Sequence, residues 1–370
     1  ALKRLRSADE EFGIALSIED GEALKAARAI DAMVADKSAK GALAGVPVAH
    51  KDMFDRAGKI ASWGARIRAD KPARTDAAAI ERLEQAGSIQ IAALHLSEFA
   101  FSPTGHNYVI GHARNPWDPT RITGGSSAGT AAAVAAGVIP AGFGSDTGGS
   151  LRVPAACCNV MSIKPTYTRV SRAGAMPLSP QLDTIGIIAR HAEDMAVMLQ
   201  AIAGMDLRDP LASRLPVANY LKLLDQPVKG LRLGVDERVV GEASAQVRKR
   251  YEVMLTLFKG LGMKIVPVGF PDWKTLDQLA QLTQFPDATA AHQAHMLTRI
   301  ADFGPQVRAR LEYGLFIPAV DHLTALRARG VYLQRTLAAT YAKADVTLLP
   351  ILADPIPTLE EIDVGGGPTL

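Results

Sequence analysis

The segment that determines the fold of this chain spans residues 123–150 and reads TGGSSAGTAAAVAAGVIPAGFGSDTGGS. Two serines, Ser126 and Ser150, each follow a Gly-Gly pair, and the alanine-rich stretch between them predicts a helix. The apolar residues from Ile139 to Phe143 then predict a buried strand. Glycines let the backbone of both loops adopt conformations closed to other residues, and consecutive N–H groups there can converge on an anion. The segment therefore predicts two glycine-rich loops around one helix and one strand, with a candidate site for the oxyanion of an acyl transfer.

Helical and strand patterns alternate outward from this segment. Strand patterns cover residues 12–18, 46–50, 89–94, 231–235, 264–268 and 346–349. Helical patterns cover residues 22–36, 77–85, 193–203, 243–261 and 331–342. Strands that alternate with helices of this length indicate an α/β fold, with a mixed, mostly parallel central sheet sandwiched between helices. The proline-containing stretch 205–230 predicts a surface connection between a half of the chain rich in motifs and a half with few.

Composition and charge argue against several classes of protein. Of the 370 residues 48% are hydrophobic and 21% charged, so a large core can be buried and we expect no intrinsic disorder. The 41 basic and 38 acidic residues are spread along the chain without a basic run, so we expect no nucleic-acid partner. The longest apolar stretch, Ala131 to Phe143, is too short to span a bilayer, and no signal peptide is visible. We therefore expect no membrane partner and a cytoplasmic location.

Cysteines and histidines give no metal or cofactor signal. The only cysteines are the neighbours Cys157 and Cys158, which cannot form a disulfide framework or a four-thiolate zinc site. We predict two buried thiols in a reducing compartment. His292 and His295 are three residues apart on a predicted helix, but no third ligand accompanies them, and we expect no metal and no cofactor.

A serine hydroxyl is a poor nucleophile without a base, and the residues leave two candidates open for that base. No Gly-x-Ser-x-Gly elbow surrounds either serine, but His50 lies at the end of the strand predicted at residues 46–50. Lys51 follows it directly, and burial of a lysine lowers its pKa until a neutral amine is available.

The residues Asp146-Thr147-Gly148 match the triplet of aspartic proteases. That chemistry needs two carboxylates, and only a homodimer would supply the second triplet, so we do not favour it.

The motifs together resemble the amidase signature family. The resemblance is carried by GGSSAG at residues 124–129, GSDTGGSLRVPA at 144–155, KPT at 164–166, LAGVP at 43–47, NPWD at 115–118 and LDT at 182–184. It covers roughly the first half of the chain, and a fainter match runs from Tyr313 to the apolar strand before Pro350. The resemblance implies the fold already expected, a mixed central sheet between helices. One departure lies near the predicted site, where Ser145 replaces the usual threonine.

The resemblance also implies a set of site residues. In the family a lysine, a serine that follows a cis peptide bond, and a nucleophilic serine form a triad. By motif position these are Lys51, Ser126 and Ser150. The oxyanion hole is implied at the N–H groups of Thr147, Gly148, Gly149 and Ser150, supporting roles at Ser127, Asp146 and Arg152, and the substrate pocket at Ile110 and Gly125.

From these residues we expect an amidase that hydrolyses a carboxylic amide to an acid and ammonia or an amine, through an acyl-enzyme on Ser150. Its partner is a small-molecule amide, and a homodimer is left open. We expect one domain over residues 1–370, with a catalytic core at about 40–204 and a variable substrate-side half at about 205–345. Family members continue beyond both ends, so we expect native terminal segments outside this sequence. Two alternatives remain: the glutaminase (A) subunit of a glutamyl/aspartyl-tRNA amidotransferase, and a catalytically silent homologue that serves as a binding module.

Overall fold

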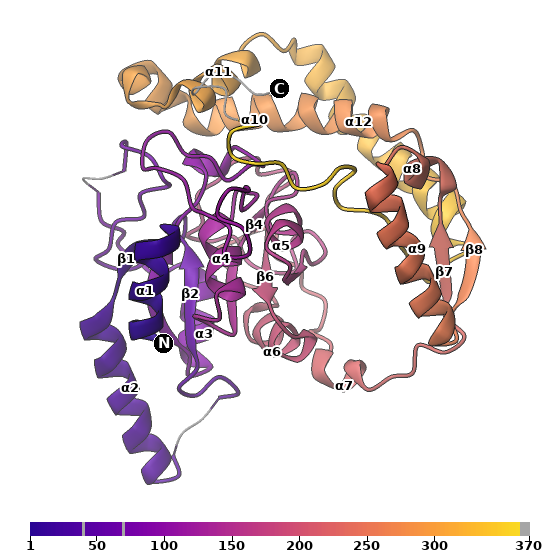
Figure 1. Cartoon of the computed structure of the whole chain (residues 1–370). Helices are drawn as coiled ribbons and strands as arrows, with labels where there is room; N and C mark the ends of the chain where they lie inside the picture. Colours follow the sequence, from indigo (N-terminus) through magenta and orange to yellow (C-terminus); the bar gives the residue numbers. More distant parts are fainter. Residues whose placement is uncertain (39–40, 69–70, 363–370) are drawn as a thin grey trace.

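The computed structural model describes residues 1–38, 41–68 and 71–362, and within them it forms a six-stranded and a three-stranded sheet (Figure 1). The six-stranded sheet has the order β1-β3-β2-β4-β6-β5, and the other has the order β8-β7-β9. The strands of the first sheet are β1 (Ala15–Ile18), β2 (Pro47–Lys51), β3 (Ile89–Leu94), β4 (Ala141–Asp146), β5 (Met161–Ile163) and β6 (Thr184–Ala189). Those of the second are β7 (Arg232–Val235), β8 (Lys264–Pro267) and β9 (Val346–Thr347). The glycines at 365–367 and Pro368, close to the expected C-terminal break, lie outside the described residues.

The helices follow the predicted alternation and add several that the sequence did not predict. The early helices are α1 (Leu2–Phe12), α2 (Asp20–Ala35), α3 (Ala78–Gln85), η1 (Glu98–Ala100), α4 (Ala128–Ala135), α5 (Arg152–Cys157), α6 (Ala192–Ile202) and α7 (Tyr220–Leu224). The later ones are α8 (Glu237–Gly241), α9 (Ala245–Gly260), α10 (Trp273–Arg299), η2 (Ile300–Asp302), α11 (Pro305–Gly314), α12 (Ala319–Thr336) and the π-helical turn η3 (Leu337–Tyr341). In this described part of the chain no helix is long and apolar enough to cross a membrane.

The first sheet is mixed, as predicted. Strands β3, β2 and β4 pair in parallel, whereas β1 pairs antiparallel with β3, β6 with β4, and β5 with β6. Since β5 is antiparallel to β6, it runs in the same direction as β4. Alternate side chains pack into two separate hydrophobic cores, one on each face of the sheet: Val48 lies in one core and Ala49 in the other. The α/β prediction with helices on both faces is confirmed.

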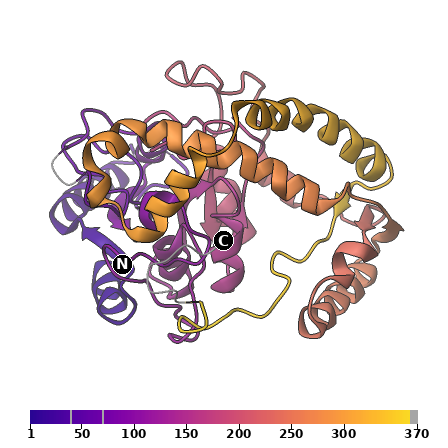
Figure 2. The ribbon, with the colours of Figure 1, turned by 90° about the horizontal axis from the view of Figure 1, so that it is seen from above.

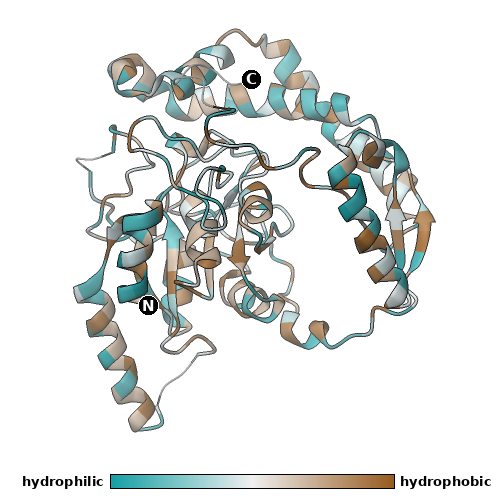
Figure 3. Ribbon diagram, in the orientation of Figure 1, coloured by the Kyte–Doolittle hydropathy of each residue, from teal (hydrophilic) through white to brown (hydrophobic). Residues whose placement is uncertain are grey.

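Some predicted boundaries are wrong, for local reasons. The strand expected at residues 12–18 begins only at Ala15, because Phe12 ends α1 and Gly13 caps that helix in the left-handed region with φ 60°. The helix expected from residue 331 begins at Ala319. Helix α10 has 27 residues, of which only the part around His292 and His295 was predicted. In α9 exposed apolar residues such as Val253 and Leu257 interrupt the polar surface, and Figure 3 shows brown and teal residues mixed along this helix.

The chain crosses between the two sheets twice. Residues 203–231, with α7, lead from the first sheet to the second. After β9 the chain returns, and Thr358 forms a β-bridge with Arg121 beside the first sheet (Figure 1). Seen from above in Figure 2, α10 and α11 lie across the first sheet. This brings residues from the motif-poor half of the chain over the glycine-rich loops.

Candidate active site

The site lies at the carboxyl ends of β2 and β4, where open α/β sheets commonly bind their ligands. Lys51 is the last residue of β2, and the two strands are neighbours through the pair His50 and Phe143. The Nζ atom of Lys51 lies 2.6 Å from Oγ of Ser126 and 3.0 Å from Oγ of Ser145, and as an ammonium it donates to both. The structure thus brings together Lys51 and Ser126, and adds Ser145, which the sequence analysis named only as a departure from the family pattern.

Burial determines the protonation state of this lysine. Its side chain has 0% exposed surface, and burial lowers the pKa of Lys51 to about 7, although the carboxylates of Asp146 and Asp183 oppose the change. A buried ammonium without a paired carboxylate loses its hydration, and this favours the neutral amine. Near neutral pH a substantial share of Lys51 therefore carries a lone pair that can accept a proton from Ser126.

The loop before α4 holds Ser126 against this amine. The Gly125–Ser126 peptide bond is cis, as the resemblance implied. The N–H of Gly125 donates to the carbonyl of Pro103 at 2.7 Å, and a Cβ at Gly125 would lie 2.6 Å from the backbone nitrogen of Gly105. Only glycine fits at that distance, so Gly125 acts by allowing the close approach of two loops. Ser127 donates through its Oγ to the carbonyl of Ser145 at 3.3 Å, which ties this loop to β4.

Asp146 organises the second glycine-rich loop. It ends β4 and is fully buried, and its carboxylate accepts hydrogen bonds from Nε and Nη2 of Arg152 at 2.9 and 2.8 Å. Burial on its own would raise the pKa of Asp146, but the hydrogen bonds and charge of Arg152 hold that pKa below its ordinary value. The same carboxylate accepts from the N–H groups of Gly149 (2.9 Å) and Leu151 (3.2 Å). Asp146 therefore fixes the turn on which Ser150 lies.

One predicted oxyanion donor needs correction. The N–H of Gly149 is turned toward Asp146, so it is already used inside the loop. Among the hydrogen bonds of the described residues, the N–H groups of Thr147, Gly148 and Ser150 donate to no protein acceptor. These three are the donors that the loop leaves for an anion.

Ser150 opens into a cavity of about 260 Å³. The loop that carries it is joined to the first serine loop by a hydrogen bond of 3.3 Å from the N–H of Ser127 to the carbonyl of Ser150. The cavity is lined by residues 100–103, by Gly148, Gly149 and Ser150, by Gln281, Gln284 and Phe285 of α10, and by Arg310 of α11. Ile110 is not among them: its N–H donates to Oδ1 of Asn107 and its side chain is 38% exposed, so the predicted pocket role of Ile110 is wrong for this cavity. The four residues of α10 and α11 were missed because no motif marks these helices.

A chain of hydrogen bonds connects the oxyanion loop to α10. The hydroxyl of Thr147 donates to Oδ1 of Asp183 at 2.6 Å, and Asp183 also accepts from the backbone N–H of Ser179. Burial raises the pKa of Asp183, whereas the hydrogen bond from Thr147 opposes this. The hydroxyl of Ser179 in turn donates to Oδ2 of Asp287 on α10 at 2.6 Å. In the sequence Asp183 was named only as part of the LDT motif at residues 182–184. Its contacts show that it connects Thr147 to the backbone of Ser179.

The other candidate base, His50, finds no support in the geometry. His50 points to the face of β2 opposite Lys51, where its ring lies 3.2 Å from Gln90 and stacks on Phe143. Burial lowers the pKa of His50 to about 4. His292 packs edge-on against Phe99 with ring centroids 4.6 Å apart. Within residues 1–38, 41–68 and 71–362, no group of three or more His, Cys, Asp or Glu side chains could hold a metal ion. Both cysteines are buried and free, as predicted.

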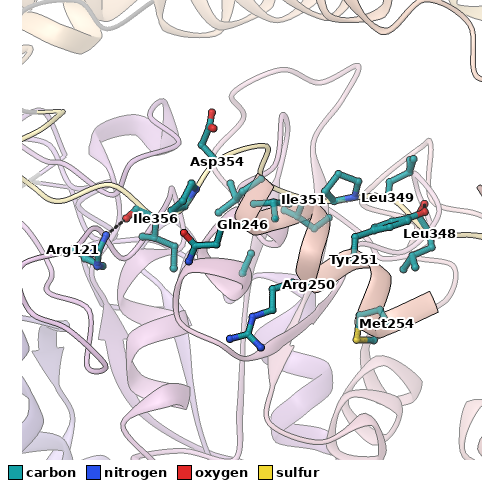
Figure 4. A pocket seen from close by; sticks show the side chains of 15 residues that line it. Arg121, Gln246, Arg250, Tyr251, Met254, Leu348, Leu349, Ile351, Asp354 and Ile356 are labelled. Carbon is teal, nitrogen blue, oxygen red and sulfur yellow. Dashed lines mark hydrogen bonds between the residues drawn. The ribbon is translucent and has the colours of Figure 1, made fainter. Parts of the chain in front are cut away.

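A second cavity, of about 690 Å³, lies between α9 and the returning segment 348–356 (Figure 4). Its lining is mostly apolar, with Arg121 donating to the carbonyl of Ile356 at one end. None of the predicted catalytic residues lines it. Of the predicted catalytic residues, Ser150 lines the smaller cavity.

Comparisons with known proteins agree with this geometry. A family model described as Amidase matches residues 1–369. Among curated relatives, the (A) subunit of the glutamyl-tRNA(Gln) amidotransferase of Halorhodospira halophila is 32% identical over all of this chain and 77% of its own length. The corresponding protein of Anaeromyxobacter sp. (strain K) is 41% identical over 74% of this chain and 56% of its own length.

Solved structures show the same architecture. A chain from a vestigial protein complex, described as revealing the evolutionary origins of an s-triazine catabolic enzyme, has a TM-score of 0.92 and 33% identity, over 99% of this chain and 80% of that one. A crystal structure described as an amidase has a TM-score of 0.86 and 29% identity, over 97% and 79% of the two chains. The peptide amidase from Stenotrophomonas maltophilia has a TM-score of 0.78 and 28% identity, over 96% and 81%.

Proposed function

This chain belongs to the amidase signature family, and from that premise we propose that it hydrolyses a small carboxylic amide through an acyl-enzyme on Ser150. The observation that carries the proposal is the fully buried amine of Lys51, 2.6 Å from the hydroxyl of Ser126, with its pKa lowered by burial to about 7. A neutral lysine amine that contacts a serine is a general base suited to work near neutral pH.

In the proposed reaction the neutral Lys51 accepts the proton of Ser126, and Ser126 accepts the proton of Ser150 as that hydroxyl attacks the amide carbonyl. The C=O π bond opens to a tetrahedral oxyanion, which the N–H groups of Thr147, Gly148 and Ser150 stabilise. One such donor is commonly worth about 3 kcal/mol of barrier. The relay then returns a proton to the amide nitrogen, the C–N bond breaks, and ammonia or an amine leaves. Water attacks the acyl-enzyme by the same relay and releases the acid.

The second glycine-rich loop supports this reaction by its rigidity. Asp146 binds Arg152 and two loop N–H groups, so the oxyanion donors hold their directions before substrate arrives. Donors fixed in advance stabilise a developing charge without reorganising at the moment of reaction. Asp146 and Arg152 are thus positioning residues, and the backbone N–H of Ser127 links the two loops.

A second candidate function is the glutaminase component of a tRNA-dependent amidotransferase. It is favoured by the curated relatives, which include the (A) subunit of glutamyl-tRNA(Gln) amidotransferase at 32% and 41% identity. The same triad would serve both functions. If the protein releases ammonia from L-glutamine only when partner subunits are added, the second candidate is correct. If it hydrolyses simple amides alone, the first is correct.

The test of the triad is covalent labelling with diisopropyl fluorophosphate, followed by mass spectrometry of the labelled peptide. We expect one phosphoryl adduct, on Ser150, and none in Ser150→Ala. Ser127→Ala is the matched control, because Ser127 lies next to Ser126 but contacts the carbonyl of Ser145 instead of the lysine amine. It should keep the label, whereas Ser126→Ala should lose most of the labelling rate. An adduct on another serine, or labelling that survives Ser150→Ala, would overturn the assignment. Ammonia release from benzamide, hexanamide, malonamide and L-glutamine then identifies the accepted class of amide.

A further inference from the structure

Besides Ser150 itself, one polar side chain that lines the cavity has no hydrogen-bond partner within the described residues. Gln284 lies on α10 and lines the cavity, half-buried. Its amide makes no hydrogen bond within the described residues. A side-chain amide offers one acceptor oxygen and two donor hydrogens, so Gln284 can bind either kind of hydrogen-bonding group.

Gln284 is directed at the oxyanion loop. A Cβ built on Gly148 would lie 3.2 Å from Oε1 of Gln284 and 4.0 Å from its Nε2, and its three nearest heavy atoms would all belong to Gln284. Gly148 supplies one of the three free N–H groups and lies two residues before Ser150. A group attached to a carbonyl bound at this loop therefore passes beside the Gln284 amide.

The neighbouring glutamine gives a contrast. Gln281 lies three residues earlier on the same face of α10 and lines the same cavity. Its Nε2 already donates to Oδ2 of Asp277 at 2.7 Å, and its side chain is exposed. Beside these two glutamines the cavity is lined by Phe101 and Phe285, whose ring centroids lie 5.4 Å apart, and by Arg310. The guanidinium of Arg310 lies over the Phe101 ring and donates to the carbonyl of Phe101.

We propose that Gln284 is a specificity-determining residue that hydrogen-bonds a second polar group of the substrate, next to the scissile amide. The substrate is then a short amide with a carboxamide or similar hydrogen-bonding group a few bonds away, and not a purely hydrocarbon amide. This inference rests on the proposed function, since it places the scissile carbonyl at Ser150. A site built to hydrogen-bond a substrate group discriminates strongly against analogues that lack it, because its own polar atoms are then left unpaired.

The test compares two amides of the same shape, butanediamide and 4-methylpentanamide. In the second, an isopropyl group replaces the distal carboxamide. We expect the wild-type protein to prefer butanediamide in kcat/KM by at least about tenfold, which corresponds to the loss of about one well-placed hydrogen bond. Gln284→Leu should abolish this preference, mainly through a higher KM for butanediamide. Gln281→Leu, the matched control, should keep the preference within about threefold.

Labelling of Ser150 by diisopropyl fluorophosphate separates the possible failures. It should proceed at the same rate in the wild type and in both leucine variants, because the reagent has no distal polar group. If the wild type takes no label on Ser150, the proposed function fails. If it takes the label, but Gln284→Leu keeps the preference, or Gln281→Leu loses it equally, the role of Gln284 is wrong. Labelling without hydrolysis of butanediamide also overturns this role, because the assigned substrate class is then incorrect.

Discussion

The two walls of the cavity at Ser150 are held in very different ways. The first wall is the loop 148–150, which lines the cavity, together with Lys51, Ser126 and Asp146 behind it. These three residues have no exposed surface and are held by hydrogen bonds. On the other side Gln281 is exposed and Gln284 half-buried. Helices α10 and α11 are attached to the core at separate points, among them two hydrogen bonds from the N–H of Gly304 to the carboxylate of Glu98, at 2.9 and 3.2 Å.

This difference suggests a division of labour. Groups that move protons or hold an oxyanion must keep their geometry within a fraction of an ångström, and burial in a network provides that. Groups that select a substrate can vary without loss of the chemistry, provided that they stay attached. Changes in the first wall should therefore act on kcat and on protonation, and changes in the second should act on KM.

The largest effect is expected at Lys51. Lys51→Met keeps the length of the side chain but removes the amine, so we expect kcat to fall by at least about 10³-fold, the usual scale for loss of a general base within a triad. In the wild type, kcat/KM should rise about tenfold per pH unit at acid pH and level off above the pKa of Lys51, about 7. An activity that falls with increasing pH across this range would contradict the assignment of Lys51 as a base.

The same pKa has a consequence for stability. Since the pKa of Lys51 is about 7 in the folded protein and 10.5 is its ordinary value, the unfolded chain binds more protons between these two pH values. The contribution of Lys51 to the free energy of unfolding therefore increases with pH in this window, and Lys51→Met should lack that increase. Urea unfolding of both proteins at several pH values measures the difference, because the contributions of other groups are common to both. Parallel pH dependences would mean that Lys51 keeps its ordinary pKa in the folded state.

The second effect concerns the ion pair that shapes the Ser150 loop. Asp146→Asn leaves Arg152, whose side chain is 42% exposed, with a neutral partner and weakens four hydrogen bonds to the buried carboxylate. We expect the free energy of unfolding to fall by about 2 kcal/mol, the scale of hydrogen bonds to a charged group. Labelling of Ser150 should slow with it. Asp345 is a matched control, because it binds Nη2 of Arg232 at 2.7 Å with similar geometry, but at 37% exposure. Asp345→Asn should cost under about 1 kcal/mol, and equal losses in both variants would show that burial of Asp146 is not what matters.

The same division explains what could be predicted from the sequence. The first wall lies in residues 43–51 and 123–155, where glycines and short polar residues follow one another closely, and the strand–loop–helix order was predicted from them. The Lys51–Ser126 contact was predicted from the resemblance of these motifs to the amidase signature family. The contact of Ser145 with Lys51 was missed because a hydroxyl on a strand gives no sign of which partner it faces. Gln284 and Arg310 were missed because a contact across a long stretch of chain depends on how α10 and α11 pack, and one sequence holds no record of that packing.

Ser145 provides a test inside the first wall. Ser145→Ala removes one of the two hydroxyls that accept from Lys51 Nζ, and both hydroxyls stabilise the charged form. We expect kcat to fall about threefold to tenfold, on the scale of about 1 kcal/mol for one hydrogen bond. The midpoint of the pH profile should move to lower pH. Ser145→Thr keeps the hydroxyl and should restore both values. If the alanine variant changes kcat without moving the midpoint, Ser145 supports the strand and does not act through Lys51.

The smallest effect is expected where the second wall is attached. Glu98 is buried, and its carboxylate accepts from the N–H of Gly304, the residue just before α11. Glu98→Ala should therefore loosen the helix that carries Arg310 and raise KM about fivefold with little change in kcat, as expected for lost binding contacts. Glu98→Gln keeps an acceptor, and its KM should stay within about twofold of the wild-type value.

Burial raises the pKa of Glu98 to about 7, although Gly304 and Arg66 oppose this. The folded protein therefore binds more protons than the unfolded chain between pH 4.5 and 7, and the contribution of Glu98 to stability is lost as the pH rises through that window. Glu98→Gln should gain stability relative to the wild type over the same window. In Glu98→Ala, a fall in kcat as large as the rise in KM would show that the second wall takes part in the chemistry.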